Sequence, residues 1–116
     1  MADLLPVSLI RQQLRLERDD EDDYLEQLAS GAIDRFQAFT GCTLVSRETP
    51  VSQLEEGQVQ AWHDIVQGLL MQVAHWYENR EMTAEKSLSE IPAASHDLWA
   101  PYVIFHLGDT DGYPHA

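Results

Sequence analysis

Residues 65–81 read IVQGLLMQVAHWYENRE, and this stretch decides the fold class because its apolar residues recur at intervals of three and four. That spacing is typical of a helix with one buried face. The pattern extends back toward the N-terminus, so we predict a single helix from Leu54 or Glu55 to Glu81. About 26 residues of helix would be about 39 Å long, which makes this the central element of a small protein.

The apolar face of this predicted helix is wide. It covers about 180° of a helical wheel, whereas a surface helix shows a stripe of about 100°. Its members are Trp62, Ile65, Val66, Leu69, Leu70, Val73, Ala74, Trp76 and Tyr77. Met71 lies outside even this arc. We therefore predict that the helix is covered twice, by its own domain and by a neighbouring copy or partner.

Arg80 falls within this apolar face, about five helical turns after Trp62. Its planar guanidinium can satisfy several acceptors at once, so it can close the end of the core, with Glu81 as one candidate partner. The alternative is a contact across subunits, and both interpretations stay open. Trp76 and Tyr77 are expected to pack on its stem. Arg80→Ala is expected to cost more than the ~0–1 kcal/mol of a surface ion pair.

Two further helices are predicted on the N-terminal side. Ser8 can cap a short first helix that ends near Leu16. The second runs from about Asp22 to Thr40, because its apolar residues repeat at three and four. Gly41 is a reasonable C-terminal stop for it.

The remaining segments complete an all-α fold, a small helical bundle with one long central helix and short N-terminal and C-terminal helices. Residues 42–54 are interpreted as a connecting loop that can form a minor hairpin. Ser95 is a plausible cap for the C-terminal helix, which Pro101 kinks or ends. We predict one helical domain over residues 1–107 and a flexible tail over 108–116.

The charge balance limits the partners. The 116 residues carry 20 acidic and 7 basic side chains, a formal net charge of −13. Such a chain repels phosphate backbones, so tight nucleic-acid binding is not expected. Binding to a basic protein surface, or a location near DNA without tight binding to it, fits this net charge better. The N-terminus has no signal-peptide pattern and no apolar run is long enough to span a membrane, so we expect a protein made in the cytoplasm.

Six of the seven residues in 17–23, ERDDEDD, are acidic. The simplest interpretation is a solvated charge run at a helix start, where acids are favoured by the exposed main-chain amides. Asp20 and Asp23 also have the spacing of a capping arrangement. Nothing around the run predicts the burial that would tune these carboxyls for acid–base catalysis.

The sequence contains no pattern that predicts an enzyme. There is no glycine-rich phosphate loop, G-x-S-x-G, H-E-x-x-H or C-x-x-C, and the five histidines lack ligand spacing. The DTDG at 109–112 covers only part of a calcium loop. Cys42, the single cysteine, follows a helix and is interpreted as an inert small residue. We expect no catalytic, cofactor-binding or metal-ligating residues.

The chain resembles the small head–tail connector proteins of long-tailed phages, also called adaptor or head-completion proteins. Four stretches carry the resemblance in order along the chain: VSLIRQQLRLE, RDDEDDYLEQLASGAIDRFQAFTGCTL, IVQGLLMQVAHWYENRE and IPAASHDLWAPYVIF. The AHWYENRE block and the acid-rich start of a helix that ends in TG are the most specific pieces. The middle, residues 43–54, is shorter than in many members, and the basic residue that often follows the C-terminal tyrosine is absent.

The resemblance implies a structural virion protein at the head–tail interface. Such subunits assemble into a homo-oligomeric ring, of roughly twelve copies, beneath the portal protein. The ring extends the DNA channel, through which DNA passes without specific binding, and offers a platform to the next neck or tail-completion protein. No membrane, cofactor or catalytic residue is implied.

Two sets of residues are our candidates for this role. The candidate structural and interface residues are Met71, Trp76, Tyr77, Arg80, Glu81, Trp99 and Tyr102. The candidate channel-facing acids are Asp19, Asp20, Glu21, Asp22 and Asp23. An outer or rim location for the acids is equally compatible with the sequence.

A different class of function also fits the charge. An acidic inhibitor that mimics DNA and occupies a basic enzyme or regulator would have this size and net charge. Its acids should be spread along one surface with phosphate-like spacing, whereas here they are bunched at one helix start. A small hydrolase or metalloprotein is a third alternative, which the absence of motifs disfavours.

Overall fold

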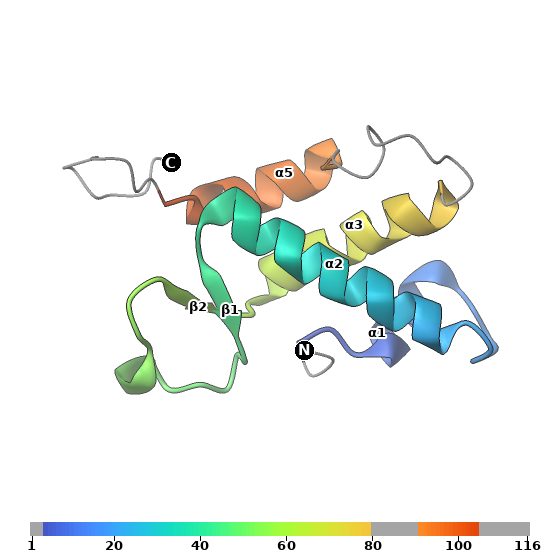
Figure 1. Cartoon of the computed structure of the whole chain (residues 1–116), viewed down its shortest axis with the longest axis horizontal. Coiled ribbons are helices and arrows are strands. Elements are labelled where there is room, and N and C mark those ends of the chain that lie inside the picture. Colours follow the sequence, from blue (N-terminus) through green and yellow to red (C-terminus); the bar gives the residue numbers. More distant parts are fainter. Residues whose placement is uncertain (1–3, 80–90, 105–116) are drawn as a thin grey trace.

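The computed structural model describes residues 4–79 and 91–104. Figure 1 shows the chain and its element labels. The helices are α1 (Val7–Leu14), α2 (Asp22–Thr40), α3 (His63–Glu78) and α5 (Ala93–Trp99), with short 3-10 turns η1 (Val51–Gln53) and η2 (Ala100–Tyr102). The strands are β1 (Thr43–Val45) and β2 (Gln58–Gln60). The molecule is mainly helical but not purely α-helical, which corrects the all-α prediction.

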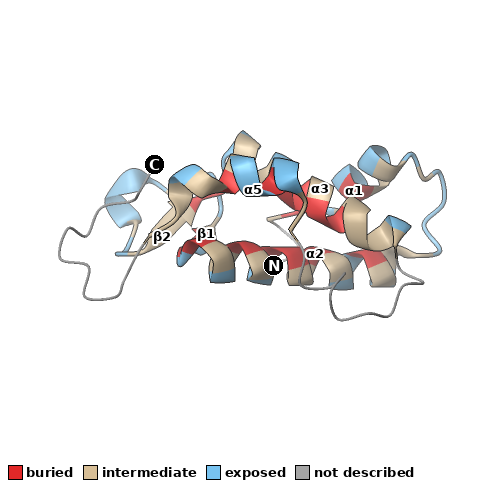
Figure 2. Ribbon diagram, turned by 90° about the horizontal axis from the view of Figure 1, so that it is seen from above, coloured by how far each residue is buried: buried red, intermediate tan, exposed pale blue. Residues whose placement is uncertain are grey.

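The helices form two layers. Figure 2 shows α2 below and α1, α3 and α5 above it, with the buried surfaces facing each other. α3 lies at the centre, because α1, α2 and α5 all pack against it. The body is flat, with extents of 47 × 33 × 18 Å. In the described ranges, no helix combines the length and the hydropathy needed to cross a bilayer.

The predicted start of the central helix is wrong. α3 begins at His63, about two turns later than the sequence pattern indicated, and the residues before it form a turn and β2. Gly57 has a left-handed φ of 84°, and Trp62 is extended with ψ 163°. The apolar spacing of Trp62 with Val66 had favoured a continuous helix, but β2 gains main-chain hydrogen bonds by pairing with β1. Glu81, the predicted end, lies outside the described residues.

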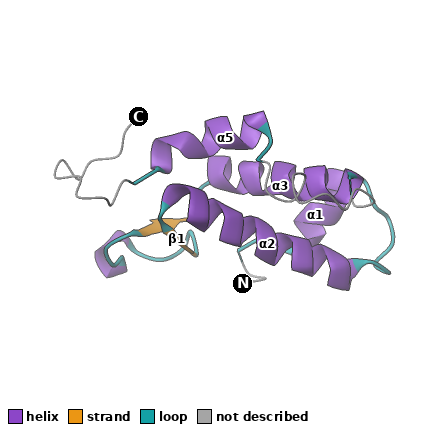
Figure 3. Cartoon of the chain, turned by 45° about the horizontal axis from the view of Figure 1, so that its top comes forward, coloured by secondary structure: helices purple, strands orange, loops and turns teal. Residues whose placement is uncertain are grey.

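The predicted minor hairpin is also wrong, because β1 and β2 pair in parallel. Thr43 faces Gln58 and Val45 faces Gln60 in the register. The segment between the strands, residues 46–57, is here called the arm. Figures 1 and 3 show it projecting from the end of the helical body, next to the short sheet.

α2 is confirmed with the predicted bounds. Its buried residues are Leu25, Ala29, Ala32, Ile33, Phe36 and Thr40, which repeat at three and four as expected for one face. Gly41 ends the helix with a φ of 81° and donates its N–H to the Gln37 oxygen. Gly41 therefore ends α2, as the sequence predicted.

The predicted caps of α1 and α2 are wrong. α1 starts after Pro6, with no side-chain cap, and Ser8 lies inside its first turn. The helix ends at Leu14 because Arg15 takes a left-handed φ of 60°. Glu21, not Asp20, occupies the capping position of α2, again without a side-chain hydrogen bond.

α5 is joined to α3 by two buried side chains. Trp99 Nε1 donates to the Ile65 oxygen at 3.2 Å. Ser95 does not cap α5 as predicted. It lies inside the helix and its hydroxyl donates to the Gly68 oxygen at 2.8 Å. α5 ends before Pro101, as expected.

The centre of the wide apolar face of α3 is buried within one subunit. Three helices surround it, so Ile65, Leu69 and Val73 are completely or almost completely buried. Burial of each such side chain contributes about 1.5–3 kcal/mol. Of the predicted apolar set, Trp62 is the most exposed, at 41%, and it precedes the helix. Val66, Ala74, Trp76 and Tyr77 are only half-buried, so cover of this face by a neighbouring copy stays a prediction.

Candidate functional site

The candidate interface residues do not gather on one surface. Met71, Trp76 and Tyr77 are half-buried on α3. Trp99 is fully buried in the core, so it offers no surface to a partner. Arg80 and Glu81 lie outside the described residues. The sequence set therefore combines core residues with surface residues.

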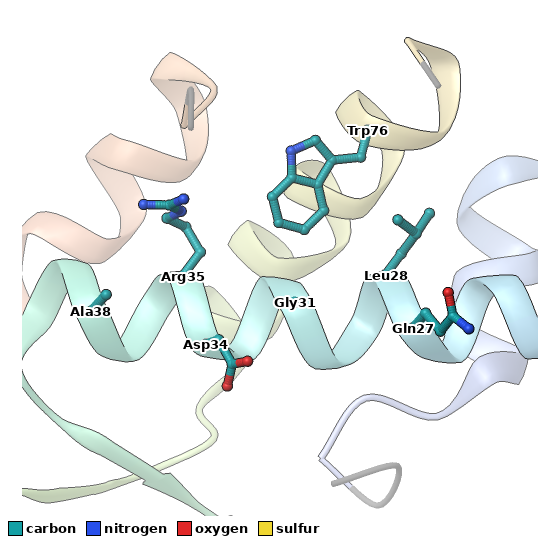
Figure 4. Close-up of a pocket in the computed structure, with 7 residues that line it drawn as sticks. All are labelled: Gln27, Leu28, Gly31, Asp34, Arg35, Ala38 and Trp76. Atoms are coloured by element: carbon teal, nitrogen blue, oxygen red, sulfur yellow. The ribbon is translucent and has the colours of Figure 1, made fainter. Parts of the chain in front are cut away.

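Trp76 borders the clearest concave site, here called the α2 groove. It lies between α2 and the C-terminal half of α3 and holds about 530 Å³. Figure 4 shows the Trp76 indole reaching from α3 toward α2 above Gly31. Its lining residues are Gln27, Leu28, Gly31, Asp34, Arg35, Ala38 and Trp76.

Gly31 allows this groove to exist. A β-carbon at this position would lie 3.2 Å from Cζ3 of Trp76, tighter than ordinary contact. The absence of a side chain lets the indole approach the α2 backbone and leaves a notch beside Leu28 and Ala38. The floor of the groove is therefore apolar, with Asp34 and Arg35 at its rim.

The α2 groove contains donors without acceptors. The Trp76 Nε1 atom is buried and has no hydrogen-bond partner among the described residues. Arg35 also forms no hydrogen bond or ion pair within the described ranges. The Nε1 atom is inaccessible from the groove, so Arg35 at the rim is the donor that a bound partner can reach.

The acidic run divides into anchored and exposed members. The Tyr77 hydroxyl donates to Glu21 Oε1 at 2.5 Å, which joins the start of α2 to the end of α3. Asp22 pairs with Arg11 of α1 at 3.0 Å. Both contacts lie within the subunit, so these two carboxylates help to hold three helices together.

Asp19, Asp20 and Asp23 are the exposed members of the candidate channel-facing set. Asp20 lies 4.0 Å from Arg18, and both side chains are largely in solvent. Such a pair contributes little to stability. The carboxylates of these three acids are therefore available to interact with charges outside the subunit.

Tyr102 joins η2 to α3. Its hydroxyl donates to Asp64, with oxygen separations of 2.8 and 3.0 Å. Burial, followed by the hydrogen bond and the negative charge of Asp64, raises the pKa of Tyr102 to about 12. The adjacent chain is tied to α2, because Ile104 N–H donates to the Thr40 oxygen at 2.7 Å. Tyr102 therefore acts within the subunit.

Cys42 is buried beneath this C-terminal segment. Its thiol donates to the Tyr102 main-chain oxygen at 3.2 Å. Burial raises the pKa of the Cys42 thiol, which keeps it protonated and unreactive. No three histidine, cysteine or acidic side chains come together as metal ligands in the parts of the chain that the structure covers.

The comparisons with known proteins identify the family. A model of the phage gp6-like head-tail connector protein family matches residues 6–102, from the start of α1 to the end of η2. The chain belongs to this family. No curated protein and no solved structure matches the connector.

Membership of this family gives the connector a structural role in the phage particle, at the joint of head and tail. The family is structural and not enzymatic. The comparison gives no support to the alternative of a DNA-mimicking inhibitor. The resemblance seen in the sequence is confirmed over the four stretches that carried it.

Sequence reasoning missed Gly31, Arg35 and the arm. A glycine within the regular apolar repeat of α2 was the available signal, since such a residue often marks a close approach. The lack of a partner for Arg35 among the described residues could not be predicted from the sequence. It depends on which acidic side chains of α3 and α5 lie close to Arg35 in the folded chain. The arm was missed because its residues were assigned to a loop and to the start of the long helix.

Proposed function

We propose that the connector assembles as a ring of like copies beneath the portal protein. The ring extends the DNA channel and offers a platform to the next neck or tail-completion protein. The observation that carries this proposal is the family match over residues 6–102. The flat shape of the subunit, whose smallest extent is 18 Å, is also compatible with close side-by-side packing in a ring. A closed ring of roughly twelve copies needs contacts between two different surfaces of the subunit.

The exposed acids supply the proposed channel surface. Asp19, Asp20 and Asp23 lie at or just before the N-terminus of α2, and all three are exposed. Negative charge that faces a duplex repels the phosphates and prevents binding, so DNA can slide. Glu21 and Asp22 are engaged inside the subunit and keep this segment in place.

The test is sedimentation velocity with the portal protein of a phage that carries this chain. The connector is expected to co-sediment with the portal as a particle much larger than either component. A connector that stays monomeric and ignores the portal would contradict the proposal.

A second measurement addresses the channel surface. Asp19→Lys, Asp20→Lys and Asp23→Lys together are expected to leave the portal complex intact and to make it retain DNA. A matched control that changes exposed Ser8, Gln12, Glu78 and Asp97 to Lys adds the same total charge elsewhere. Equal DNA retention by both variants would show that the acids do not face the channel.

A further inference from the structure

We propose that the α2 groove of one connector receives the tip of the arm, Pro50 and Val51, from a second copy. This inference rests on the proposed ring and names the two surfaces that meet in it. The groove and the tip are different parts of the same chain. If the same two copies do not exchange arms reciprocally, this contact is head-to-tail, the kind that closes into a ring.

The arm is ordered, and near its base Arg47 contacts His63 at the start of α3. The Thr49 N–H donates to the Ser46 oxygen at 3.0 Å, and the Gln53 N–H donates to the Pro50 oxygen at 2.9 Å. The Gln60 side chain reaches the Thr49 oxygen at 3.4 Å. A segment held by its own hydrogen bonds loses little conformational freedom on binding, so it is prepared to dock.

The arm tip is also the most exposed apolar feature among the described residues. Val51 is 74% exposed, against 41% for Trp62 and 37% for Leu9. Figure 1 shows the arm extending away from α2, so it cannot cover the groove of its own chain. An exposed aliphatic side chain on a projecting, ordered turn is a candidate anchor.

Size and polarity of the groove fit this tip. The notch at Gly31 and the side chains of Leu28 and Ala38 form an apolar floor that can accept Pro50 and Val51. The volume of about 530 Å³ exceeds that of two side chains, so a turn of main chain can enter as well.

Charge complementarity favours the second copy over an arbitrary apolar ligand. The groove rim carries the guanidinium of Arg35, which has no partner among the described residues, beside the exposed carboxylate of Asp34. The arm carries exposed carboxylates at Glu48, Glu55 and Glu56. The chain has only 7 basic residues, so few positions can pair with the carboxylates of the arm. Arg35, beside the apolar notch, is one of them. Such pairing sets the register of a contact more than its strength.

Disulfide trapping tests the contact directly. Two chains are prepared in a Cys42→Ala background, one with Val51→Cys in the arm and one with Ala38→Cys in the groove, which carry tags of different mass. Mixed at high concentration under mild oxidation, they are expected to give mainly the mixed dimer. The matched control replaces Ala38→Cys by Gln12→Cys, an exposed position on α1. Circular dichroism verifies that each variant is folded.

A charge exchange supplies the second readout. Arg35→Glu in the groove chain is expected to reduce the mixed dimer several-fold, and Glu48→Arg in the arm chain is expected to restore it. Restoration excludes misfolding as the cause of the loss. A mixed dimer no more abundant than the Gln12→Cys control, or a dominant Val51→Cys homodimer, would overturn the inference.

The two experiments distinguish an error in the proposed function from an error in the proposed contact. If the unmodified connector assembles on the portal but the arm and groove do not cross-link, the ring uses other surfaces and the inference is wrong. If they cross-link but the connector ignores the portal, the contact is real and the proposed function is wrong. Binding of the groove to the portal protein in place of the arm would also overturn the inference.

Discussion

The indole of Trp99 lies directly on Gly68 of α3. A β-carbon at residue 68 would come within 2.9 Å of Cε2 and 3.0 Å of Cδ1 of that ring. Trp99 is completely buried and also meets Phe36 of α2 edge-on, with ring centroids 5.4 Å apart. One tryptophan thus locks α2, α3 and α5 together, and the glycine makes its position possible.

Gly68→Ala is expected to destabilise the fold by about 1–3 kcal/mol, because the added methyl group overpacks a rigid ring. The measurement is the free energy of unfolding in urea. Gly31→Ala is the matched control, since its β-carbon would meet Trp76 at a milder 3.2 Å. There the helix propensity of alanine, about 0.8–1.0 kcal/mol over glycine, offsets the crowding. Equal losses for both variants would contradict the role of Trp99.

Ser95→Ala is expected to lower the free energy of unfolding by about 0.5–1.5 kcal/mol, the net value of one hydrogen bond. The hydroxyl is fully buried and bonds the Gly68 oxygen. Ser52→Ala, at an exposed arm position, is the control and should be neutral within error. A neutral Ser95→Ala would mean that the hydroxyl does not join α5 to α3.

Glu21→Gln is expected to destabilise the protein by roughly 1 kcal/mol, since the Tyr77 hydroxyl loses a charged acceptor. Asp19→Asn removes the same charge from an exposed neighbour and should have little effect. Hydrogen exchange at the start of α2 should also rise in Glu21→Gln. If the two variants are equally stable, the acidic run is uniformly solvated and Tyr77 does not anchor it.

The Tyr102–Asp64 contact predicts a loss of stability in alkaline solution. Folding raises the pKa of Tyr102 from 10.0 to about 12, so the folded state keeps a proton that the unfolded chain releases. The stabilisation is complete below pH 10.0 and falls as the pH rises toward about 12. Tyr102→Phe should be less stable at neutral pH and should lose less stability over this alkaline range. Parallel declines in the two proteins would refute the linkage.

Local patterns were sufficient for α2 and for the end of α5. The bounds of α2 follow from an apolar repeat and from Gly41, whose φ of 81° suits a residue without a side chain. The same kind of argument failed at residues 55–62. There the apolar spacing was compatible with a helix. The residues instead form β2, which pairs with β1, and each β1 residue lies fifteen positions before its β2 partner in the sequence. No local pattern contains that partner.

By itself, the sequence determined that this is a mainly helical, strongly acidic connector with an acidic run at residues 17–23, because periodicity, charge and family motifs are properties of neighbouring residues. Only the tertiary structure decided what those residues do. It buried the centre of the apolar face of α3 under three helices, divided the acids into anchored and exposed groups, and left Arg35 without an acceptor among the described residues, beside an apolar notch. Burial and pairing depend on which side chains distant segments bring together, and that information exists only once the chain has packed.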